Sequence, residues 1–339
     1  MPGRRAFLGA VLASLGSFMS GCGGSERPPS RPRQAPLPPL ATSRLDALLP
    51  LAGLKWLILA RPREIASIPW LIPPIGTIVP EDRFAAFAAS TGLDLRQIPE
   101  AIVASYAAEE GEASAYVVRH GGDALTIERA FRRRLTGAER RSVDRPDVVR
   151  VSGKIGTASH AFAAIGPDVV CFQQGGSVSR GPLRVATLYA TGKLTRSPAA
   201  LAEDPLRSLA GRFGAAPARA FALGPFEGEL ARGARGLLAA ATAIGAAARP
   251  SAREGIALAV AVAGDFSKSG EPAERELLAA WDELARGSFG HLLGLDAPVT
   301  APLATHSDEA VAIAVELDPG RLAKGLADAT RNQIAEIMR

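Results

Sequence analysis

A serine between small residues is the strongest candidate for a nucleophile in this sequence. The segment Gly175-Gly176-Ser177-Val178-Ser179 nearly matches the Gly-x-Ser-x-Gly elbow of hydrolases, but it ends in serine instead of glycine. It follows an apolar strand predicted at 169–173 and precedes a predicted helix, which is the context that the elbow needs. Because the last glycine is missing, we favour a turn in which a serine caps the following helix.

Histidines and cysteines are too few to indicate a metal centre. The four histidines are His120, His160, His291 and His306, and no two of them stand at a metal-binding spacing. His306 precedes two acidic residues in a predicted turn, where carboxylates are usually solvated. We therefore predict neither a metal nor another cofactor, and His306 stays a second starting point for an atypical hydrolase site.

Cys171 lies inside an apolar run, Val169 to Phe172. A reactive thiol needs a partly exposed and electropositive setting, which this run does not provide. We predict that Cys171 is a small buried hydrophobic residue.

The densest charge in the sequence is a group of arginines, namely Arg129, Arg132, Arg133, Arg134, Arg140 and Arg141. Arg129, Arg132 and Arg133 share one face of a predicted helix. That face could contact the phosphates of anionic lipids or an acidic partner. Glu128 and Glu139 dilute the charge, so we favour a solvated helix and loop and keep contact with an anionic partner as a hypothesis.

Short strands joined by turns of three to five residues predict antiparallel pairing, and therefore an α+β fold. We expect strands at 54–60, 101–106, 113–120, 148–152, 157–165, 169–173, 219–223, 256–262, 298–305 and 310–317. We expect helices at 81–90, from Asp123 to about 134, at 183–189, 229–247 and 271–286, and from Asp318 onward. The order of these elements indicates a duplicated strand–helix–strand–helix–hairpin unit. Its two halves would be residues 44–195 and 196–339.

The composition is that of a globular protein. Hydrophobic residues make up 47% of the chain, which excludes a disordered body. The net charge of +5 is too small to favour nucleic acid as a partner. After the N-terminal segment, no apolar run is long enough to predict a membrane span.

The first 22 residues have the pattern of an export signal. Arg4 and Arg5 precede the apolar stretch 6–19, and small residues then lead to Cys22. Arg4 to Leu8 resembles the twin-arginine export signature, and Met19-Ser20-Gly21-Cys22 resembles a bacterial lipobox. The lipobox resemblance implies that residues 1–21 are a signal peptide and that Cys22 is acylated as the mature N-terminus.

This resemblance also implies a location. Residues 22–43 form a Pro-rich tether without a hydrophobic period, which at ~3 Å per residue would reach about 60 Å from the bilayer. We expect a protein on the periplasmic side of the cell envelope, held to the membrane by its N-terminal lipid. Gly23 is not the Asp that retains lipoproteins at the inner membrane, so the outer membrane is favoured.

Three functions fit this sequence. The first is a lipid-anchored envelope protein with a non-enzymatic binding or structural role, its partner being an envelope protein or anionic lipid. The second is a carrier of an apolar ligand or lipid in a groove. The third is a hydrolase with an atypical site at Ser177 or His306. The missing catalytic pattern favours the first.

Overall fold

The computed structural model describes residues 37–109, 111–195, 199–228, 232 and 234–337, with side chains up to residue 329. The chain divides into a first unit, Met1–Leu37, and a second unit, Pro38–Arg339. All the described helices and strands lie in the second unit. Arg4, Arg5, Cys22 and most of the predicted tether lie outside the described residues.

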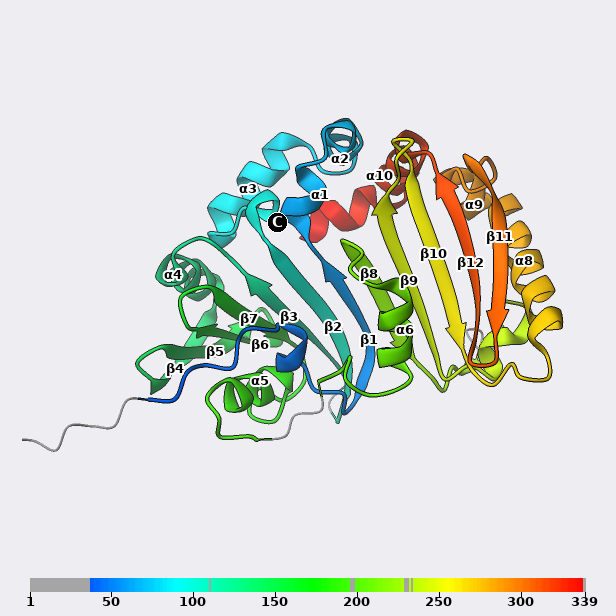
Figure 1. The fold of residues 1–339 in the computed structure, drawn as a ribbon. Coiled ribbons are helices and arrows are strands. Elements are labelled where there is room, and N and C mark those ends of the chain that lie inside the picture. Colours follow the sequence, from blue (N-terminus) through cyan, green and yellow to red (C-terminus); the bar gives the residue numbers. More distant parts are fainter. Residues whose placement is uncertain (1–36, 110, 196–198, 229–231, 233, 338–339) are drawn as a thin grey trace, which may run out of the picture. The chain divides into compact units, whose positions relative to one another are not determined.

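The strands form a single sheet (Figure 1). The first half contributes β1 (Leu54–Ala60), β2 (Glu100–Ala108), β3 (Gly111–Arg119), β4 (Thr136–Arg145), β5 (Val148–Ile155), β6 (Ala158–Ile165) and β7 (Val169–Gln174). The second half contributes β8 (Ala218–Leu223), β9 (Ala243–Pro250), β10 (Ile256–Ala263), β11 (Thr300–Ser307) and β12 (Ala310–Leu317). The sheet has 12 strands in the order β11-β12-β10-β9-β8-β1-β2-β3-β7-β6-β5-β4. Every described pairing is antiparallel, which confirms the α+β prediction.

Helices connect the strands and cover parts of both faces. The α-helices are α1 (Pro62–Ala66), α2 (Ile72–Ile78), α3 (Glu81–Thr91), α4 (Ala124–Arg134), α5 (Pro182–Ala190), α6 (Leu206–Phe213), α8 (Gly270–Arg286), α9 (Ser288–Leu293) and α10 (Pro319–Ile337). Short 3-10 helices are η1 (Asp46–Leu48), η2 (Pro69–Leu71), η3 (Leu95–Gln97) and η4 (Ala234–Ala239). As predicted, Asp123 caps α4, its carboxylate accepting from the amides of Leu125 and Thr126.

The two halves follow the same path through the sheet, outward from the central β1–β8 pair. Each begins with a central strand, continues through helical segments to a hairpin, β2–β3 or β9–β10, and then passes through a helix, α4 or α8. Each then returns through a meander whose last strand, β7 or β12, pairs with the second hairpin strand. The predicted strand–helix–strand–helix–hairpin unit is present only in a modified form, because a hairpin stands in place of its second strand and the first half ends in the strands β4 to β7 instead of a hairpin.

The predicted helix at 229–247 is wrong. The part of that range that the structure describes holds η4 and then β9, which lies between β8 and β10. Arg235 has a left-handed backbone (φ 57°), which interrupts the helical path. Alanine has the highest intrinsic helix propensity, but tertiary contacts override this preference, and here its small side chain suits a strand packed closely under α6. At Gly245 a Cβ would lie 2.5 Å from the ring of Phe213.

The expected solvated loop after Arg134 is also wrong. Residues 136–145 form β4, which pairs with β5 as an outer strand of the sheet. Its residues are mostly exposed and charged, a pattern that is typical of edge strands.

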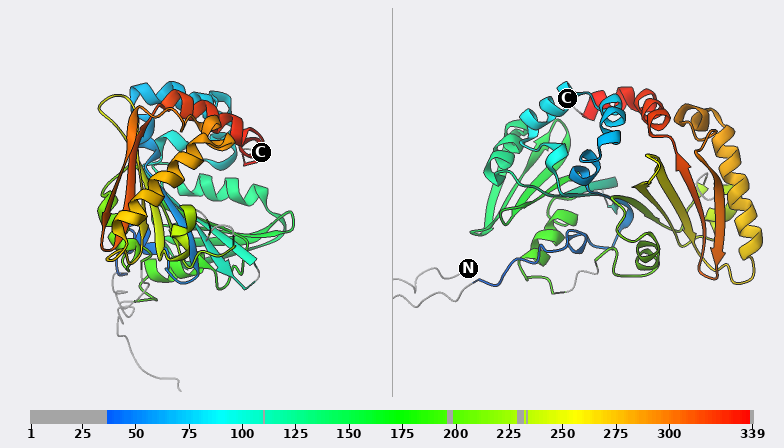
Figure 2. Two further views of the ribbon diagram at one scale, coloured as in Figure 1. Left: turned by 90° about the vertical axis from the view of Figure 1, so that its right-hand side faces the viewer. Right: turned by 45° about the horizontal axis from the view of Figure 1, so that its top comes forward.

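The two faces of the sheet are covered differently. Along β1, Leu57 and Leu59 are buried in the core beneath η1, α5 and α6. The opposite face packs against α4 at one end and α8 at the other (Figure 2, left). Between these helices, Trp56 and Ile58 are 38% and 43% exposed. The centre of this second face is therefore partly open to solvent in the part of the chain that the structure describes.

Candidate functional site

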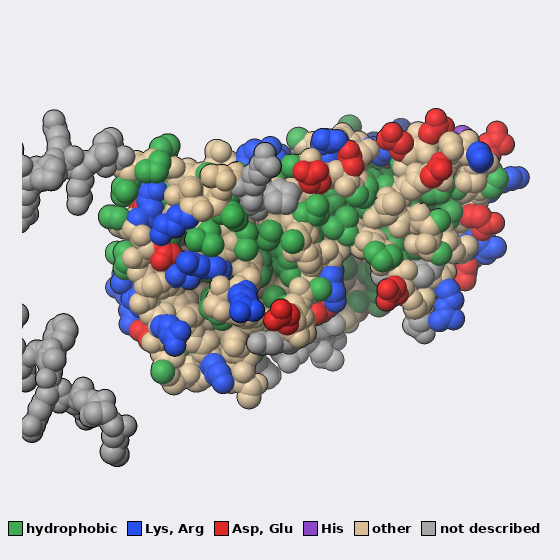
Figure 3. Space-filling model, turned by 90° about the horizontal axis from the view of Figure 1, so that it is seen from below, with side chains coloured by type: hydrophobic (Ala, Val, Ile, Leu, Met, Phe, Trp, Pro, Cys, Tyr) green, Lys and Arg blue, Asp and Glu red, His purple; other side chains and the backbone are tan. Residues whose placement is uncertain are grey.

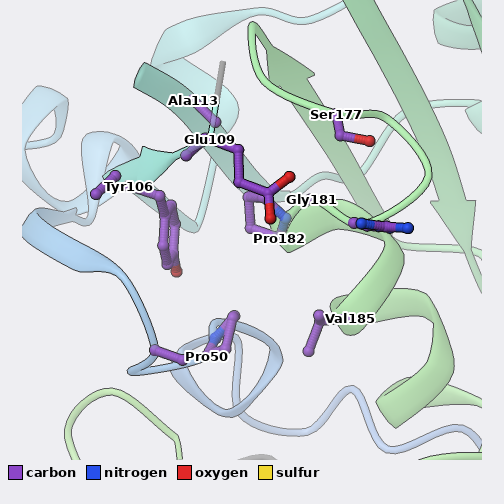
Figure 4. Close-up of a pocket in the computed structure, with 12 residues that line it drawn as sticks. Pro50, Tyr106, Glu109, Ala113, Ser177, Gly181, Pro182 and Val185 are labelled. Carbon is purple, nitrogen blue, oxygen red and sulfur yellow. The ribbon is translucent and has the colours of Figure 1, made fainter. Parts of the chain in front are cut away.

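A pocket lies where the end of β2 meets the start of α5 (Figure 4). Its volume is about 290 Å³. Its walls come from the segment before β1, the β2–β3 hairpin, and the loop from β7 to α5. We call it the Tyr106 pocket, and its lining residues are Pro50, Ala52, Tyr106, Ala107, Ala108, Glu109, Ala113, Ser177, Arg180, Gly181, Pro182 and Val185.

The loop that carries Ser177 and Arg180 is held by one buried amide. Gln173, only 1% exposed, donates from Nε2 to the carbonyls of Gly175 and Ser177, and its Oε1 accepts from the amide of Leu183. Gly181 allows this close packing, because a Cβ there would lie 2.3 Å from Nε2 of Gln173. The loop is therefore fixed to the sheet before any ligand binds.

The polar groups of the pocket differ in burial. Tyr106 is 3% exposed, and its hydroxyl has no hydrogen-bond partner among the described residues. Burial raises the pKa of the Tyr106 phenol, so this group is a neutral donor. Glu109 and Arg180 are exposed, and neither side chain forms an ion pair within the described part of the chain. Figure 4 shows Glu109 projecting into the space between Tyr106 and Pro182.

The structure does not assemble the serine–histidine pair that a hydrolase would need. In the described residues, the Ser177 hydroxyl bonds to Ser179 at 3.1 Å. The Nδ1 atom of His306 bonds to Glu274 of α8 at 2.6 Å, far along the sheet from Ser177. The predicted serine cap is wrong, because Gly181 precedes Pro182 at the start of α5 without a side-chain cap. Ser177 therefore lines the Tyr106 pocket, and among the described residues no histidine is bonded to its hydroxyl.

Cys171 is buried in the core, as predicted, and is 1% exposed. Burial raises the pKa of its thiol to about 12, which keeps it protonated at neutral pH. It therefore packs as an apolar residue.

The predicted basic residues gather on α4 and β4. We call this set the arginine surface, and it consists of Arg129, Arg132, Arg133, Arg134, Arg140 and Arg141, all exposed. As the helical spacing predicted, Arg129, Arg132 and Arg133 line one open hollow of about 470 Å³ beside Thr126 and Glu139. Seen from below, Lys and Arg side chains gather at the left-hand end of the sheet and most acidic ones at the other (Figure 3).

Half of the arginines of the arginine surface lie close to acidic residues of the same chain. Arg132 pairs with Glu139, and Arg141 Nε lies 2.8 Å from Oε1 of the buried Glu128. Arg129 lies 3.8 Å from Asp123. Arg133, Arg134 and Arg140 have no acidic partner in the described ranges, and their charges face solvent. These three arginines are therefore available to an external anion.

A third feature is the uncovered centre of the sheet. Trp56, Ile58, Ile244 and Val260, with small residues of β8 and β9, line an open hollow of about 270 Å³ that has no polar lining. It is a depression in the sheet face and not an enclosed cavity. Within the residues described, no helix is long and apolar enough to cross a membrane.

Together these features define an α+β protein with one continuous antiparallel sheet and a loop-walled pocket. No family model and no curated protein matches the sequence. Among solved structures, crystal form III of TP0453 resembles this chain with a TM-score of 0.50 at 10% identity, covering 84% of this chain and 97% of that one. Crystal form IV gives a TM-score of 0.47 at 9% identity, covering 82% and 96% respectively. This likeness shows the fold alone.

Proposed function

We propose that this chain is an exported, lipid-anchored envelope protein with a non-enzymatic binding role, and that the arginine surface contacts anionic lipid headgroups. The observation that carries the proposal is the set of three unpaired arginines, Arg133, Arg134 and Arg140, on adjoining elements. A cation near an anionic membrane surface contributes about 1 kcal/mol. A tether from Cys22 would keep this surface within reach of the bilayer to which the lipid is attached.

The carrier alternative rests on a different observation, the apolar hollow at Trp56 and Ile58. The hollow offers an acyl chain one apolar wall and leaves its other side in water. Burial of apolar area, which would drive binding, is therefore incomplete. We rank the carrier role second for this reason.

The proposal is tested by vesicle co-sedimentation of the mature chain carrying Cys22→Ala, which removes the lipid and leaves the protein surface as the only contact. We expect binding to vesicles that contain phosphatidylglycerol and not to pure phosphatidylcholine. Replacing Arg133, Arg134 and Arg140 by Gln should weaken binding by about a hundredfold, at ~1 kcal/mol per charge. Raising salt to about 0.5 M should also release the protein, since exposed charges are screened.

A matched control removes the same charge elsewhere. Arg253, Lys268 and Arg275 are exposed in the second half and have no acidic partner in the residues described. Their replacement by Gln should leave vesicle binding nearly unchanged. Equal losses for the two triple variants would show that net charge, and not the arginine surface, drives binding.

A further inference from the structure

We infer that the Tyr106 pocket binds a small zwitterionic molecule with an apolar body. The apolar part of the site comes from Pro50, Pro182, Val185 and the ring of Tyr106. Its volume of about 290 Å³ is close to the lower end of ligand pockets, on the order of 300 to 1000 Å³. The pocket therefore accepts a compact body such as one aromatic ring or one branched alkyl group.

The buried hydroxyl of Tyr106 identifies one contact of this ligand. Buried hydroxyls nearly always have a hydrogen-bond partner, and this one has none in the described part of the chain. Figure 4 shows the Tyr106 side chain extending toward Pro50. A ligand oxygen placed there would accept the hydrogen bond of the phenol.

The charges beside the pocket identify the other contacts. Arg180 approaches from the loop before α5 and Glu109 from the end of β2, so a cation and an anion line the same space. Neither has an ion-pair partner within the described residues. A ligand carboxylate can accept hydrogen bonds from Arg180 and Tyr106, and a ligand ammonium group can donate to Glu109. A ligand with one charge would leave the other lining group unmatched.

The loop that carries Ser177 and Arg180 needs little reorganisation on binding. The amide of Gln173 holds the loop between Gly175 and Leu183 through three hydrogen bonds, so the backbone that carries Ser177 and Arg180 is placed in advance. Preorganised loops lose less conformational entropy when a ligand binds. The pocket shares no residue with the arginine surface, so this inference and the proposed lipid contact can fail independently.

Three probes with the same phenyl ring separate the charges. We would titrate the mature Cys22→Ala chain by calorimetry with phenylalanine, with 3-phenylpropionate and with 2-phenylethylamine. We expect phenylalanine to bind about tenfold tighter than either singly charged probe, a factor typical of one added charge-assisted hydrogen bond. Equal affinities for the three probes would overturn the zwitterion assignment, and no binding by any of them would overturn the site.

Substitutions of the lining residues test whether the probes bind in the Tyr106 pocket. Tyr106→Phe removes only an unpartnered hydroxyl, so the fold should be kept while phenylalanine binds about tenfold more weakly. Arg180→Gln should reduce the affinity for phenylalanine to that for 2-phenylethylamine, and Glu109→Gln to that for 3-phenylpropionate. Ala52→Trp, at an exposed position of the wall, should fill the pocket and abolish binding. Arg207→Gln, outside the pocket, is the matched control. Unchanged binding in Ala52→Trp or Tyr106→Phe would overturn the inference.

Discussion

His120 is a buried residue whose ring lacks a well-placed hydrogen-bond partner among the described residues. It is 5% exposed, and neither ring nitrogen has a hydrogen-bond partner in the described ranges. Burial lowers the pKa of its imidazole, because a charged ring would lose its hydration, and this effect outweighs the opposite influence of the Gly122 backbone and of the charges of Asp168 and Asp123. The pKa of His160 is also lowered, mainly by burial and to a smaller extent by the charge of Arg134. Both side chains therefore favour the neutral form in the folded protein.

This burial predicts a loss of stability on mild acidification. The unfolded chain binds protons at these histidines near the ordinary pKa of 6.5, whereas the folded chain binds them only at lower pH. The stability is thus fully present above pH 6.5 and is lost as the pH falls through the lower pKa values of the folded state. Urea unfolding of wild type and His120→Leu at pH 7.5 and 5.5 measures this.

We expect the free energy of unfolding to fall less in His120→Leu than in wild type, and least when His160→Leu is added. Identical losses in all three proteins would show that other groups set the acid response.

At the residue scale, the sequence predicted part of the candidate site. Ser177 was singled out by its glycine neighbours, and it does line a pocket. Tyr106 and Gln173 were missed, because each stands in a strand whose pattern gives no sign of a buried polar group. Gln173 at the end of an apolar run before Gly175-Gly176 was the one available indication. The helical spacing placed Arg129, Arg132 and Arg133 together correctly, but which arginines are unpaired depends on β4.

At the scale of elements, a buried carboxylate joins α4 to β4. The Glu128 side chain is 4% exposed and lies against Arg141 and Arg132, at 2.8 and 4.0 Å. Glu128→Gln leaves Arg141 with a neutral partner, while Arg132 keeps its pair with Glu139, and should lower the free energy of unfolding by about 2 kcal/mol. Urea denaturation checks this.

Glu139→Gln is the matched control, because Glu139 pairs with Arg132 at the surface. The hydrogen bond from Arg132 lowers the pKa of Glu139, but water screens this pair. Its replacement should change the unfolding midpoint less than Glu128→Gln does. The reverse order would show that the buried pair is not the stronger connection.

Most strands could be predicted because alternation of large and small residues is a local property. β9 could not, because alanine fits both a helix and a strand, and only the neighbouring β8 and β10 decide between them. β4 was hidden by its charge, since an edge strand needs no apolar face. Both strands pair with the next strand along the chain, β4 with β5 and β9 with β10, so the errors come from residue types that do not look like strands and not from sequence distance.

At the scale of the whole second unit, one strand pair joins the two halves of the sheet. β1 pairs with β8, and Ile58 faces Ala220 in that register. Proline at position 220 would remove a ladder hydrogen bond from the middle of the sheet and should lower stability by ~3 kcal/mol or more. Ala301→Pro, in the irregular part of the outer strand β11 beside Pro302, should have little effect.

Urea unfolding of Ala220→Pro and Ala301→Pro compares the centre of the sheet with its edge. Similar losses in both variants would contradict the central role of the β1–β8 pair.

The antiparallel α+β class was predictable from strand spacing, but a single sheet was not. The residues of β1 and β8 are separated by the whole first half, and no local pattern marks them as partners.

The β1–β8 pair also sets an order of events during synthesis. β1 leaves the ribosome long before β8, so the first half can form its sheet while one long side of β1 has no neighbour. The unpaired amides and carbonyls of this strand can form hydrogen bonds with an extended segment of another chain. Protection comes only when β8 docks, more than a hundred residues later. The proposed twin-arginine export, which would carry folded cargo, would allow this closure to finish before the chain is exported.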